Sequence, residues 1–372
     1  MSLTFLEGNE AIAWGAFDAG CRFFAGYPIT PATSIYSAML KLLPPAGGIV
    51  LQGEDEIASL GYCLGASMAG WKAMTATSGP GISLFSEQIS FAIGSEIPVV
   101  IVDVQRLGPS TGYATKGADG DIQFLRWGNS GGLSPIVLAP VDARDCYTLT
   151  IHAFNLAERF RTPVFLASSK EIGLTGESID FERLERPPLT ERREAPPGNE
   201  YLPFRAAPGS EVPFFAPLGG DTVARQTSSM HGEDGYITAD PMVIAAQVER
   251  LNRKVAAHVD SFTYYESEIV QGADTLLLTY GVSAGAARQA RRELSAEGRA
   301  VSLAVLKTLW PVPESLIRGL AAEATRVLVV EANLGQYVRE IERIVTDRKV
   351  DFLGRMDGDL IAPTRIQEAV ID

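Results

Sequence analysis

One apolar run, Pro98–Val104, limits the possible folds more than any other segment of the chain. It is far too short for a membrane helix, and polar residues do not alternate with apolar ones, which indicates a strand buried on both faces. Such strands are typical of parallel sheets covered by helices. Shorter apolar segments alternate with helical stretches through the first half, beginning with a predicted helix over Thr4–Gly20. The sequence therefore predicts an α/β fold with a doubly wound parallel sheet.

The second half repeats this alternation on a smaller scale. Its predicted strands are 274–280, 300–306 and 326–331. The segment 176–235, between the two series, is rich in proline and glycine, and the sequence leaves open whether it is a linker or an arm on a surface. We predict two domains: residues 1–255, which include this arm at about 176–235, and a smaller α/β domain over residues 256–372.

Charge and composition exclude several classes of protein. The net charge is −13, from 45 acidic and 32 basic residues, whereas nucleic-acid-binding proteins are usually basic. Three cysteines without a CxxC motif, and three histidines, give no basis for a metal site or an iron–sulfur cluster on this chain. No segment approaches the ~18 apolar residues of a membrane helix, and no targeting peptide is recognisable. We expect a cytoplasmic protein that binds neither nucleic acid nor a membrane.

Two turns follow predicted strands, at the sheet edge where open α/β sheets bind ligands. In Gly26–Pro31 (GYPITP), two prolines restrict the backbone and hold the Thr30 hydroxyl group in a defined position, as a donor to a carbonyl or carboxylate group. The alternative is that Thr30 only caps the following helix. The glycine-rich turn Ser78–Gly81 has the character of an anion site, although such turns are more often architectural.

Two acidic residues lie where the next strand passes into a helix. Glu56 leads into an apolar helical segment, where burial favours a protonated carboxyl group that can donate to a heteroaromatic nitrogen. Glu54 is the competing candidate, and helix capping is the alternative for both. The helix also contains Gly61 and Gly65, which suggests close approach of another backbone, as at a subunit interface, or of a flat ligand.

A cationic loop follows the central apolar strand. Arg106 lies in Gln105–Gly112 (QRLGPSTG), and its planar guanidinium group suits a carboxylate ligand. The alternative is a structural ion pair with Asp103 or Asp121. Lys116 is the candidate for a second cation nearby.

Taken in order, these motifs resemble the 2-oxoacid:ferredoxin oxidoreductase family, and specifically its α subunit, which contains a pyrimidine-binding domain of the thiamine-diphosphate-binding type. The matching segments of the first domain are GYPITP (26–31), QGEDEI (52–57), TSGPG (77–81), QRLGPSTG (105–112) and VDARDCYTLT (141–150). The second domain adds LKTLWP (306–311) and VEANLGQ (330–336), which resemble the C-terminal domain of transketolases. Ser110–Gly112, followed by Thr115 and Lys116, is more similar to the 2-oxoglutarate enzymes than to the pyruvate enzymes.

The resemblance implies thiamine diphosphate bound between two subunits. It implies that Glu56 or, alternatively, Glu54 contacts the pyrimidine ring and favours the tautomer that activates the cofactor. By the same resemblance, Thr30 and Arg106 bind the 2-oxo and carboxylate groups of the substrate, with Lys116 as a further substrate-binding residue. The other residues that it places at the cofactor are Tyr27, Pro28, Ile29 and Gly79.

The resemblance also implies a partner. The chain lacks the Gly-Asp-Gly followed by Asn that holds magnesium and the diphosphate in thiamine enzymes, and it lacks clustered cysteines. We expect a β subunit that carries the diphosphate-binding domain, Mg²⁺ and a 4Fe–4S cluster, an (αβ)2 assembly, and no additional N-terminal γ-type domain on this chain. The expected reaction converts 2-oxoglutarate and coenzyme A into succinyl-CoA and CO2 and reduces ferredoxin, or runs in reverse. The alternatives are an enzyme for branched-chain or other 2-oxoacids, such as indolepyruvate, and a non-catalytic α/β binding protein.

Overall fold

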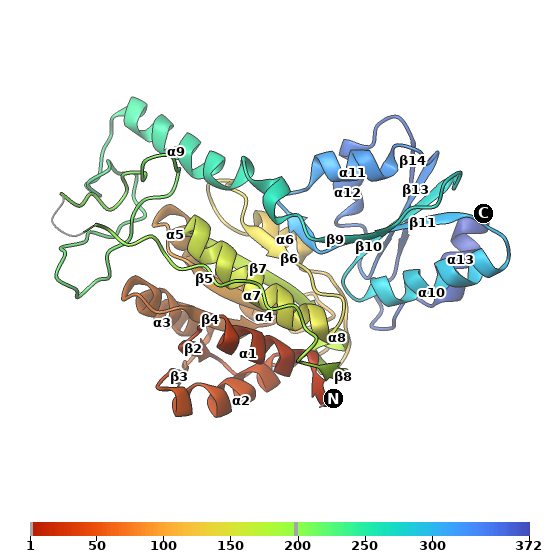
Figure 1. The fold of residues 1–372 in the computed structure, drawn as a ribbon, viewed down its shortest axis with the longest axis horizontal. Helices are drawn as coiled ribbons and strands as arrows, with labels where there is room; N and C mark the ends of the chain where they lie inside the picture. The colour runs from red at the N-terminus through yellow and green to blue at the C-terminus, as the bar shows by residue number, and fades with distance from the viewer. Residues whose placement is uncertain (1–2, 197–199) are drawn as a thin grey trace.

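The computed structural model describes residues 3–196 and 200–372, and its largest unit is a seven-stranded sheet (Figure 1). The strand order is β12-β6-β7-β5-β4-β2-β3, and every neighbouring pair is parallel except β12 with β6. The predicted buried strand forms most of β5, at the centre of the sheet, where every residue is buried. The strands are β2 (Phe23–Gly26), β3 (Ile49–Gln52), β4 (Ala73–Thr77), β5 (Val99–Gln105), β6 (Ile136–Leu138), β7 (Pro163–Ser169) and β12 (Thr308–Trp310).

Helices cover both faces of this sheet. Successive residues of a strand point to opposite faces, so Phe24 packs in a core with α1, α2 and α7, whereas Phe23 packs in a core with α3, α4, α5 and α6. The predicted doubly wound parallel sheet is therefore confirmed. The helices are α1 (Gly8–Asp18), α2 (Thr33–Leu42), α3 (Glu56–Met68), α4 (Gly79–Leu84), α5 (Ser86–Gly94), α6 (Ile122–Trp127), α7 (Ala143–Phe160) and α8 (Lys170–Leu174).

A five-stranded sheet forms the smaller α/β unit, which is blue in Figure 1. Its order is β14-β13-β10-β11-β9, with β9 antiparallel at one edge and the other pairs parallel. The strands are β9 (Tyr265–Glu268), β10 (Thr275–Tyr280), β11 (Val301–Leu306), β13 (Arg326–Glu331) and β14 (Lys349–Gly354). The remaining helices are α9 (Pro241–Ala256), which precedes this sheet, α10 (Ser283–Ala296), α11 (Glu314–Ala321), α12 (Val338–Ile344) and α13 (Pro363–Ile371).

Strand β12 connects the two sheets. It follows β11 of the smaller sheet after one residue, Lys307, and then pairs with β6 at the edge of the larger sheet. The indole nitrogen of Trp310 donates to the carbonyl oxygen of Ile122 at 3.3 Å, and the Tyr337 hydroxyl group donates to the carbonyl oxygen of Leu309 at 3.1 Å. These side chains belong to one continuous core that lies against one face of each sheet.

The predicted helix over Thr4–Gly20 is wrong at its start. Residues Leu3–Glu7 form strand β1, which pairs antiparallel with β8 (Gly176–Asp180), and α1 begins only at Gly8. Figure 1 shows the red strand that begins at Leu3 beside β8. Local periodicity cannot reveal this strand, because its hydrogen-bonding partner lies far along the chain.

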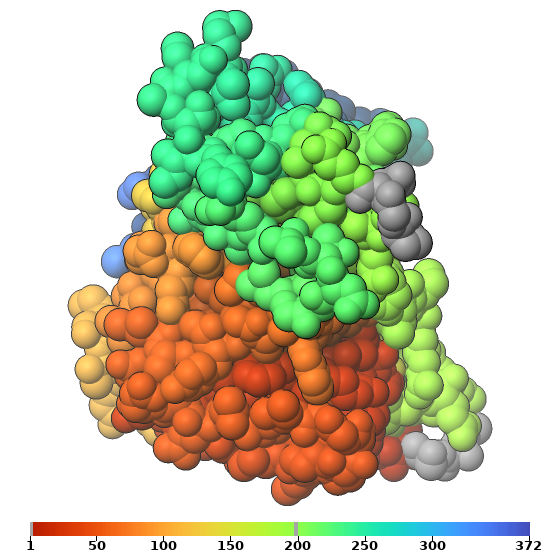
Figure 2. All heavy atoms as spheres, turned by 90° about the vertical axis from the view of Figure 1, so that its left-hand side faces the viewer, coloured from red at the N-terminus to blue at the C-terminus, as the bar shows by residue number. Residues whose placement is uncertain are grey.

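The proline-rich segment 176–235 is an arm on the surface of the larger unit rather than a free linker; its residues 197–199 lie outside the described part. Figure 2 shows the green part of the arm seated on the orange residues of the first half. Arg192 anchors it: the guanidinium group forms a buried ion pair with Glu158 of α7 and donates to the carbonyl oxygens of Ser67 at 2.6 Å and Trp71 at 2.9 Å. The arm is therefore held by charged side chains as well as by backbone contacts.

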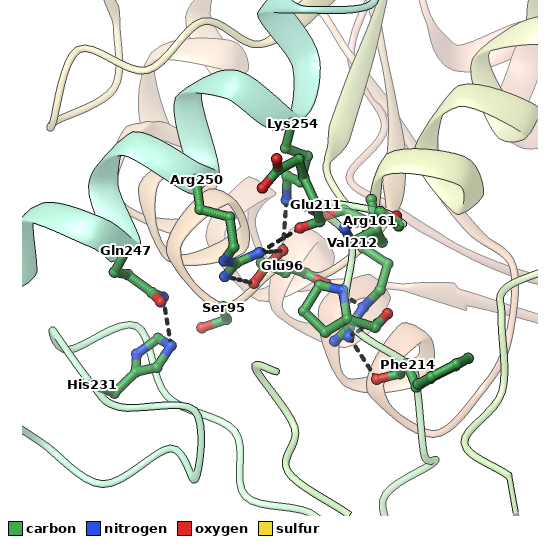
Figure 3. A network of polar contacts seen from close by, with 12 residues as sticks. Ser95, Glu96, Arg161, Glu211, Val212, Phe214, His231, Gln247, Arg250 and Lys254 are labelled. Atoms are coloured by element: carbon green, nitrogen blue, oxygen red, sulfur yellow. Dashed lines mark hydrogen bonds and ion pairs between the residues drawn. The ribbon is translucent and has the colours of Figure 1, made fainter. Parts of the chain in front are cut away.

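A second buried network fixes the end of the arm and α9 to the larger unit (Figure 3). We call Glu96, Arg161, Arg250 and Lys254 the Glu96 cluster. The Glu96 carboxylate accepts from Arg250 at 2.6 Å and from Lys254 at 2.9 Å, and Arg161 donates to the Glu96 carbonyl oxygen at 3.2 Å. Burial opposes the ionisation of Glu96, but the charges of Lys254 and Arg250 outweigh it and lower its pKa to about 2. Two cations thus bind one ionised carboxylate, and a third donates to the backbone carbonyl oxygen of the same residue.

Candidate active site at the sheet edge

Four of the sequence motifs meet at one edge of the larger sheet. The segments 26–31, 52–57, 77–81 and 105–112 begin at the last residues of β2, β3, β4 and β5, respectively. These strands are neighbours and run parallel, so their carboxyl ends lie side by side. The four motifs therefore lie together at one edge of the sheet, the edge where open α/β sheets bind ligands.

The first of these segments is an exposed loop with a buried anchor. Tyr27 is 40% exposed, Pro28 and Thr30 are exposed, and Ile29 is half-buried. Asn9 of α1, which is fully buried, donates to the carbonyl oxygen of Pro31 and to the Ser34 hydroxyl group, both at 2.8 Å. The sequence reasoning missed Asn9. The available signal was an asparagine on the otherwise apolar face of the first helix.

The structure separates Glu54 from Glu56. Glu54 is exposed and accepts a hydrogen bond from the Tyr62 hydroxyl group at 3.2 Å on the outer side of α3. Asp55 caps α3 by accepting from the backbone N–H of Ala58 at 2.7 Å. Glu56, the first residue of the helix, is only 8% exposed. Capping by Asp55 therefore leaves the neighbouring Glu56 carboxyl group free for another role.

The Glu56 side chain lies against the first turn of α4. A Cβ atom at position 81 would lie 2.7 Å from Cγ and 2.9 Å from Oε1 of Glu56, so only glycine permits this approach. The same Cβ atom would collide with the hydroxyl group of Thr77 at the end of β4. Within the described residues, no hydrogen bond reaches the Glu56 carboxyl group. A nearly buried acid without a protein partner, beside a glycine cradle, is suited to contact a ligand.

Arg106 is 6% exposed and organises the neighbouring loops. Its Nη1 donates to the carbonyl oxygen of Thr30 at 2.6 Å, and its Nη2 donates to that of Thr111 at 2.8 Å. Its Nε is buried without a hydrogen-bond partner among the described residues. The alternative role, an ion pair with Asp103 or Asp121, is not formed in that part of the chain. Arg106 thus joins two of the motif loops and keeps unused donors.

The loop after Arg106 closes on itself, and Lys116 ends it. The backbone N–H of Leu107 donates to the carbonyl oxygen of Lys116 at 2.8 Å, and the N–H of Tyr113 donates to that of Leu107 at 2.8 Å. Gly112 has φ +47°, and a Cβ atom there would collide with the Leu107 carbonyl group. The Lys116 ammonium group pairs with Asp359 at 3.0 Å on the surface of the smaller unit. In this structure, Lys116 therefore bridges the two units.

A cavity of about 410 Å³ opens between the two units at this edge. Gly79, Arg106, Ser110 and Asp121 line it from the larger unit, and Leu334 and Gln336 line it from the smaller one. A Cβ atom on Gly79 would lie 3.0 Å from Oδ2 of Asp121, so the glycine makes room for this carboxyl group. The cavity therefore combines two predicted site residues, Gly79 and Arg106, with an acid that the sequence reasoning considered only as a structural partner.

Three carboxyl groups next to this cavity lack counter-charges in contact with them. We call Asp103, Asp119 and Asp121 the aspartate cluster. Both carboxyl oxygens of Asp103 and Asp119, and Oδ2 of Asp121, are buried without a hydrogen-bond partner among the described residues.

Burial raises the pKa of all three groups of the aspartate cluster. The pKa of Asp103 is well above its usual range, with Asp121 and Asp119 adding to the effect of burial. Burial and the charge of Glu171 raise the pKa of Asp119 to about 8. Burial raises the pKa of Asp121 to about 6, although the charge of Arg106 opposes the increase. At neutral pH the cluster therefore retains protons, because its members cannot all be ionised together.

The smaller unit forms hydrogen bonds to the loop that contains Asp119 and Asp121. Asn333 donates to the carbonyl oxygen of Asp119 at 2.8 Å, and Gln336 donates to that of Gly120 at 2.5 Å. Asn333 and Gln336 belong to the motif VEANLGQ, which the sequence reasoning used only for the resemblance. Amide side chains directly after an apolar strand were the signal that could have marked them as contact residues.

Residues 3–196 and 200–372 contain neither a metal-binding cluster nor a membrane-spanning helix. No group of three or more His, Cys, Asp or Glu side chains in these ranges has a geometry that could hold a metal ion. No helix there is long and apolar enough to cross a membrane.

Comparisons with known proteins give consistent results along the chain. Residues 14–250 match the family model "pyruvate flavodoxin/ferredoxin oxidoreductase, thiamine diP-bdg", and residues 273–366 match "pyruvate:ferredoxin oxidoreductase core domain II". The chain is 39% identical to the 2-oxoglutarate synthase subunit KorA of Methanocaldococcus jannaschii, over 100% of both chains. It is 33% identical to the ketoisovalerate oxidoreductase subunit VorB of Methanothermobacter thermautotrophicus, over 100% of this chain and 97% of that protein.

A solved structure shares the fold closely. The 2-oxoglutarate:ferredoxin oxidoreductase from Magnetococcus marinus, with 2-oxoglutarate, coenzyme A and succinyl-CoA bound, superposes with a TM-score of 0.95 at 34% identity. The match covers 99% of this chain and 65% of that one, so this chain spans less than two thirds of the solved chain. The matched model covers most of the chain, and the relatives align along its whole length. The chain therefore belongs to the thiamine-diphosphate-binding pyruvate flavodoxin/ferredoxin oxidoreductase family.

Proposed function

We propose that this chain is the α subunit of a 2-oxoglutarate:ferredoxin oxidoreductase. The reaction would convert 2-oxoglutarate and coenzyme A into succinyl-CoA and CO2 with reduction of ferredoxin, or run as the reverse carboxylation. The observation that carries the proposal is the placement of Thr30, Glu56 and Arg106 at one sheet edge, on adjoining strand ends. The higher identity to a 2-oxoglutarate synthase subunit, 39% against 33% for a ketoisovalerate enzyme subunit, supports 2-oxoglutarate as the substrate.

The surroundings of Glu56 fit the pyrimidine ring of thiamine diphosphate. Gly81 lets the Glu56 side chain pack against the first turn of α4, and the Glu56 carboxyl group, which has no protein partner among the described residues, is available to hydrogen-bond the ring nitrogen. When bound, thiamine diphosphate supplies a carbon nucleophile and an electron sink for decarboxylation. In this proposal Glu56 holds a proton at the ring nitrogen, whereas Glu54 remains outside the site. The further residues proposed to contact the cofactor are Tyr27, Pro28, Ile29 and Gly79.

The Arg106 and Thr30 side chains are proposed to bind the substrate. A guanidinium group has five N–H donors, and Arg106 uses only two of them, on the carbonyl oxygens of Thr30 and Thr111. The remaining donors are available for the C1 carboxylate. The Thr30 hydroxyl group is exposed at the same place and is proposed to donate to the 2-oxo oxygen. Lys116, which pairs with Asp359, remains a proposed binding residue that would have to leave that ion pair.

A partner subunit is proposed to cover α3. Ile57 and Tyr62 are 46% and 41% exposed on this helix, and a Cβ atom at Gly65 would meet nothing within 4 Å. A helix face of apolar and small residues permits close packing of another chain. We propose that the covering chain is a partner β subunit that carries Mg²⁺, the diphosphate site and a 4Fe–4S cluster, in an (αβ)2 complex that passes electrons to ferredoxin. Separately, we propose that residues 1–255 and 256–372 form the two domains of this chain.

The test uses the complex of this chain with its β subunit and measures 2-oxoglutarate-dependent reduction of ferredoxin or a viologen dye. Glu56→Gln is expected to lower kcat by about 10²- to 10⁴-fold, the usual contribution of a positioned proton donor. Glu54→Gln is expected to retain activity within about threefold, because Glu54 contacts only Tyr62. Loss of activity in the Glu54 variant with retention in the Glu56 variant would reverse the assignment, and full activity of the double variant would reject it.

The substrate is tested separately with a panel of 2-oxoacids on the unmodified complex. The proposal expects the highest kcat/KM for 2-oxoglutarate. A higher value for a branched-chain 2-oxoacid would retain the family chemistry but reject the substrate.

A further inference from the structure

Arg106 and Asp121 face the same cavity without forming an ion pair. Both line the cavity of about 410 Å³, and each influences the ionisation of the other. In the described part of the chain, no direct nitrogen–oxygen contact joins the guanidinium and carboxyl groups. Opposite charges that line one cavity without contact leave space for a ligand group between or beside them.

The two groups are held in place by independent contacts. Arg106 is fixed by the carbonyl oxygens of Thr30 and Thr111, and its buried Nε remains unpartnered. The backbone N–H of Asp121 donates to the Gln105 side chain at 3.0 Å, and Gly79 allows the carboxyl group its position beside α4. The Arg106 guanidinium group and the Asp121 backbone are therefore each anchored by contacts that do not involve the other group.

Among the described residues, the ionisable groups other than Arg106 that interact with Asp121 are acidic, and Lys170, a cation beyond them, pairs with Glu171 at 3.5 Å. Asp103 on β5 and Asp119 on the same loop add negative charge, and Asp119 in turn faces Glu171 of α8 and Glu331 of β13. The residues that the smaller unit contributes to the cavity are Leu334, Gln336 and Met356, which carry no charge. In the part of the chain that the structure describes, Arg106 is thus the cation that favours ionisation of Asp121.

We propose that Arg106 and Asp121 compensate each other's charge in the free site, and that Asp121 takes up a proton when an anionic carboxylate group binds to Arg106. Asp121 is then a positioning residue that controls affinity without contacting the reacting atoms. This inference rests on the proposed function, because it takes the bound anion to be the C1 carboxylate of the 2-oxoacid. The proton comes from solvent on binding and returns to solvent after the carboxylate has left as CO2.

The expected pH dependence of substrate affinity follows from the rise in the pKa of Asp121 on binding of an anion. Burial raises the pKa of Asp121 to about 6 while Arg106 opposes the increase, and a bound anion at Arg106 removes that opposition and raises the pKa further. The liganded form then holds more protons than the free form at and above about pH 6. Affinity is therefore highest below about pH 6 and falls as the pH rises, at most tenfold per pH unit.

The first test compares KM for 2-oxoglutarate in the αβ complex between about pH 6 and pH 8. The unmodified enzyme is expected to show KM rising by about tenfold over this range with a smaller change in kcat. Asp121→Asn imitates the protonated acid, so its KM is expected to be low and nearly constant. Asp274→Asn, an exposed aspartate with the same change of charge, serves as the matched control and should keep the rise. A merely structural Asp121 would instead give a higher KM at every pH.

The second test needs no variant. Calorimetric titration of the unmodified complex with 2-hydroxyglutarate, which has both carboxylates but no carbonyl group to attack, is carried out at about pH 7 in phosphate and in Tris buffer. A difference in the measured enthalpy between buffers that corresponds to proton uptake supports the inference. Binding without proton uptake overturns it and leaves the proposed function standing. Absence of binding, together with absence of 2-oxoglutarate turnover, overturns both.

Discussion

The aspartate cluster and the Glu96 cluster are two buried groups of ionisable side chains. The first has more acids than cations, and the second has more cations than acids. In the Glu96 cluster, three cations surround one carboxylate, and the carboxylate accepts hydrogen bonds from Arg250 and Lys254. In the aspartate cluster, three acids lie near one cation, and the carboxyl oxygens of Asp103 and Asp119 have no partner among the described residues. One cluster fixes an arm to the surface, whereas the other borders the cavity between the two units.

The two clusters show where this chain tolerates unpaired polar groups. Burial of an ion without a partner costs several kcal/mol, so a structural site satisfies its ions, as the Glu96 cluster does for its carboxylate. The aspartate cluster avoids part of that cost by keeping protons, which makes it responsive to pH and to any anion that enters the cavity. Unsatisfied groups are expected at sites of function rather than in the structural core.

The largest effect is expected from Glu96→Gln. Removal of the Glu96 charge leaves Arg161, Arg250 and Lys254 without the buried carboxylate at their centre, which should lower the free energy of unfolding by about 3–5 kcal/mol. The measurement is urea denaturation at neutral pH. Limited proteolysis should also show faster cleavage in the segment 176–235. A loss below about 1 kcal/mol would mean that the cations do not depend on Glu96.

The next effect concerns the pH dependence of stability and Asp119. Its pKa rises from 3.8 in the unfolded chain to about 8 in the folded one, so the native state binds more protons in this window. Stability from this group is complete below about pH 4 and falls towards pH 8, by up to about 1.4 kcal/mol per pH unit. Asp119→Asn should remove that contribution to the slope, measured by urea denaturation at several pH values, whereas Asp274→Asn should not. If the free energy of unfolding of Asp119→Asn depends on pH as steeply as that of the unmodified chain, the aspartate cluster does not retain protons as described.

The smallest effect is expected from Lys254→Met. Lys254→Met removes the hydrogen bonds to the Glu96 carboxylate and to the Arg161 carbonyl oxygen, but Arg250 still donates to both carboxylate oxygens of Glu96, so we expect a loss of about 1–3 kcal/mol. Burial lowers the pKa of Lys254 to about 8 from 10.5, despite the nearby Glu96. The unfolded chain therefore binds more protons between these values, and stability rises with pH there. Lys254→Met should abolish this rise. If it lowers the free energy of unfolding as much as Glu96→Gln does, the Glu96 cluster does not have the excess of cations that we describe.

The sequence predicted the larger sheet well because its central strands are apolar on both faces. The same strand ends carried the four motifs, so their common edge followed from the parallel arrangement. What it could not predict were pairings between distant segments. Strand β1 depends on β8, and β12 crosses from one sheet to the other, and neither pairing leaves a local periodic signal.

The candidate site was predicted to the level of the motif but not of the individual side chain. Glu54 and Glu56 are equivalent in local sequence, and only the turn of α3 decides that Glu56 faces inward while Glu54 faces Tyr62. The sequence predicted that Arg106 binds either a ligand carboxylate or an aspartate. In the structure its guanidinium group donates hydrogen bonds to two backbone carbonyl oxygens. The aspartate cluster depends on the contact of two units, which a pass along the chain cannot reveal.

The position of β12 has a consequence for the integrity of the chain. A fragment that ended before the smaller sheet would leave β6 as the edge of its sheet, with the apolar residues Ile136–Leu138 and their open backbone groups available to other molecules. Such a fragment is expected to aggregate, and a fragment that began at the smaller sheet would expose Leu309 and Trp310. We therefore expect the two units to unfold together in one cooperative transition, although each has a sheet of its own.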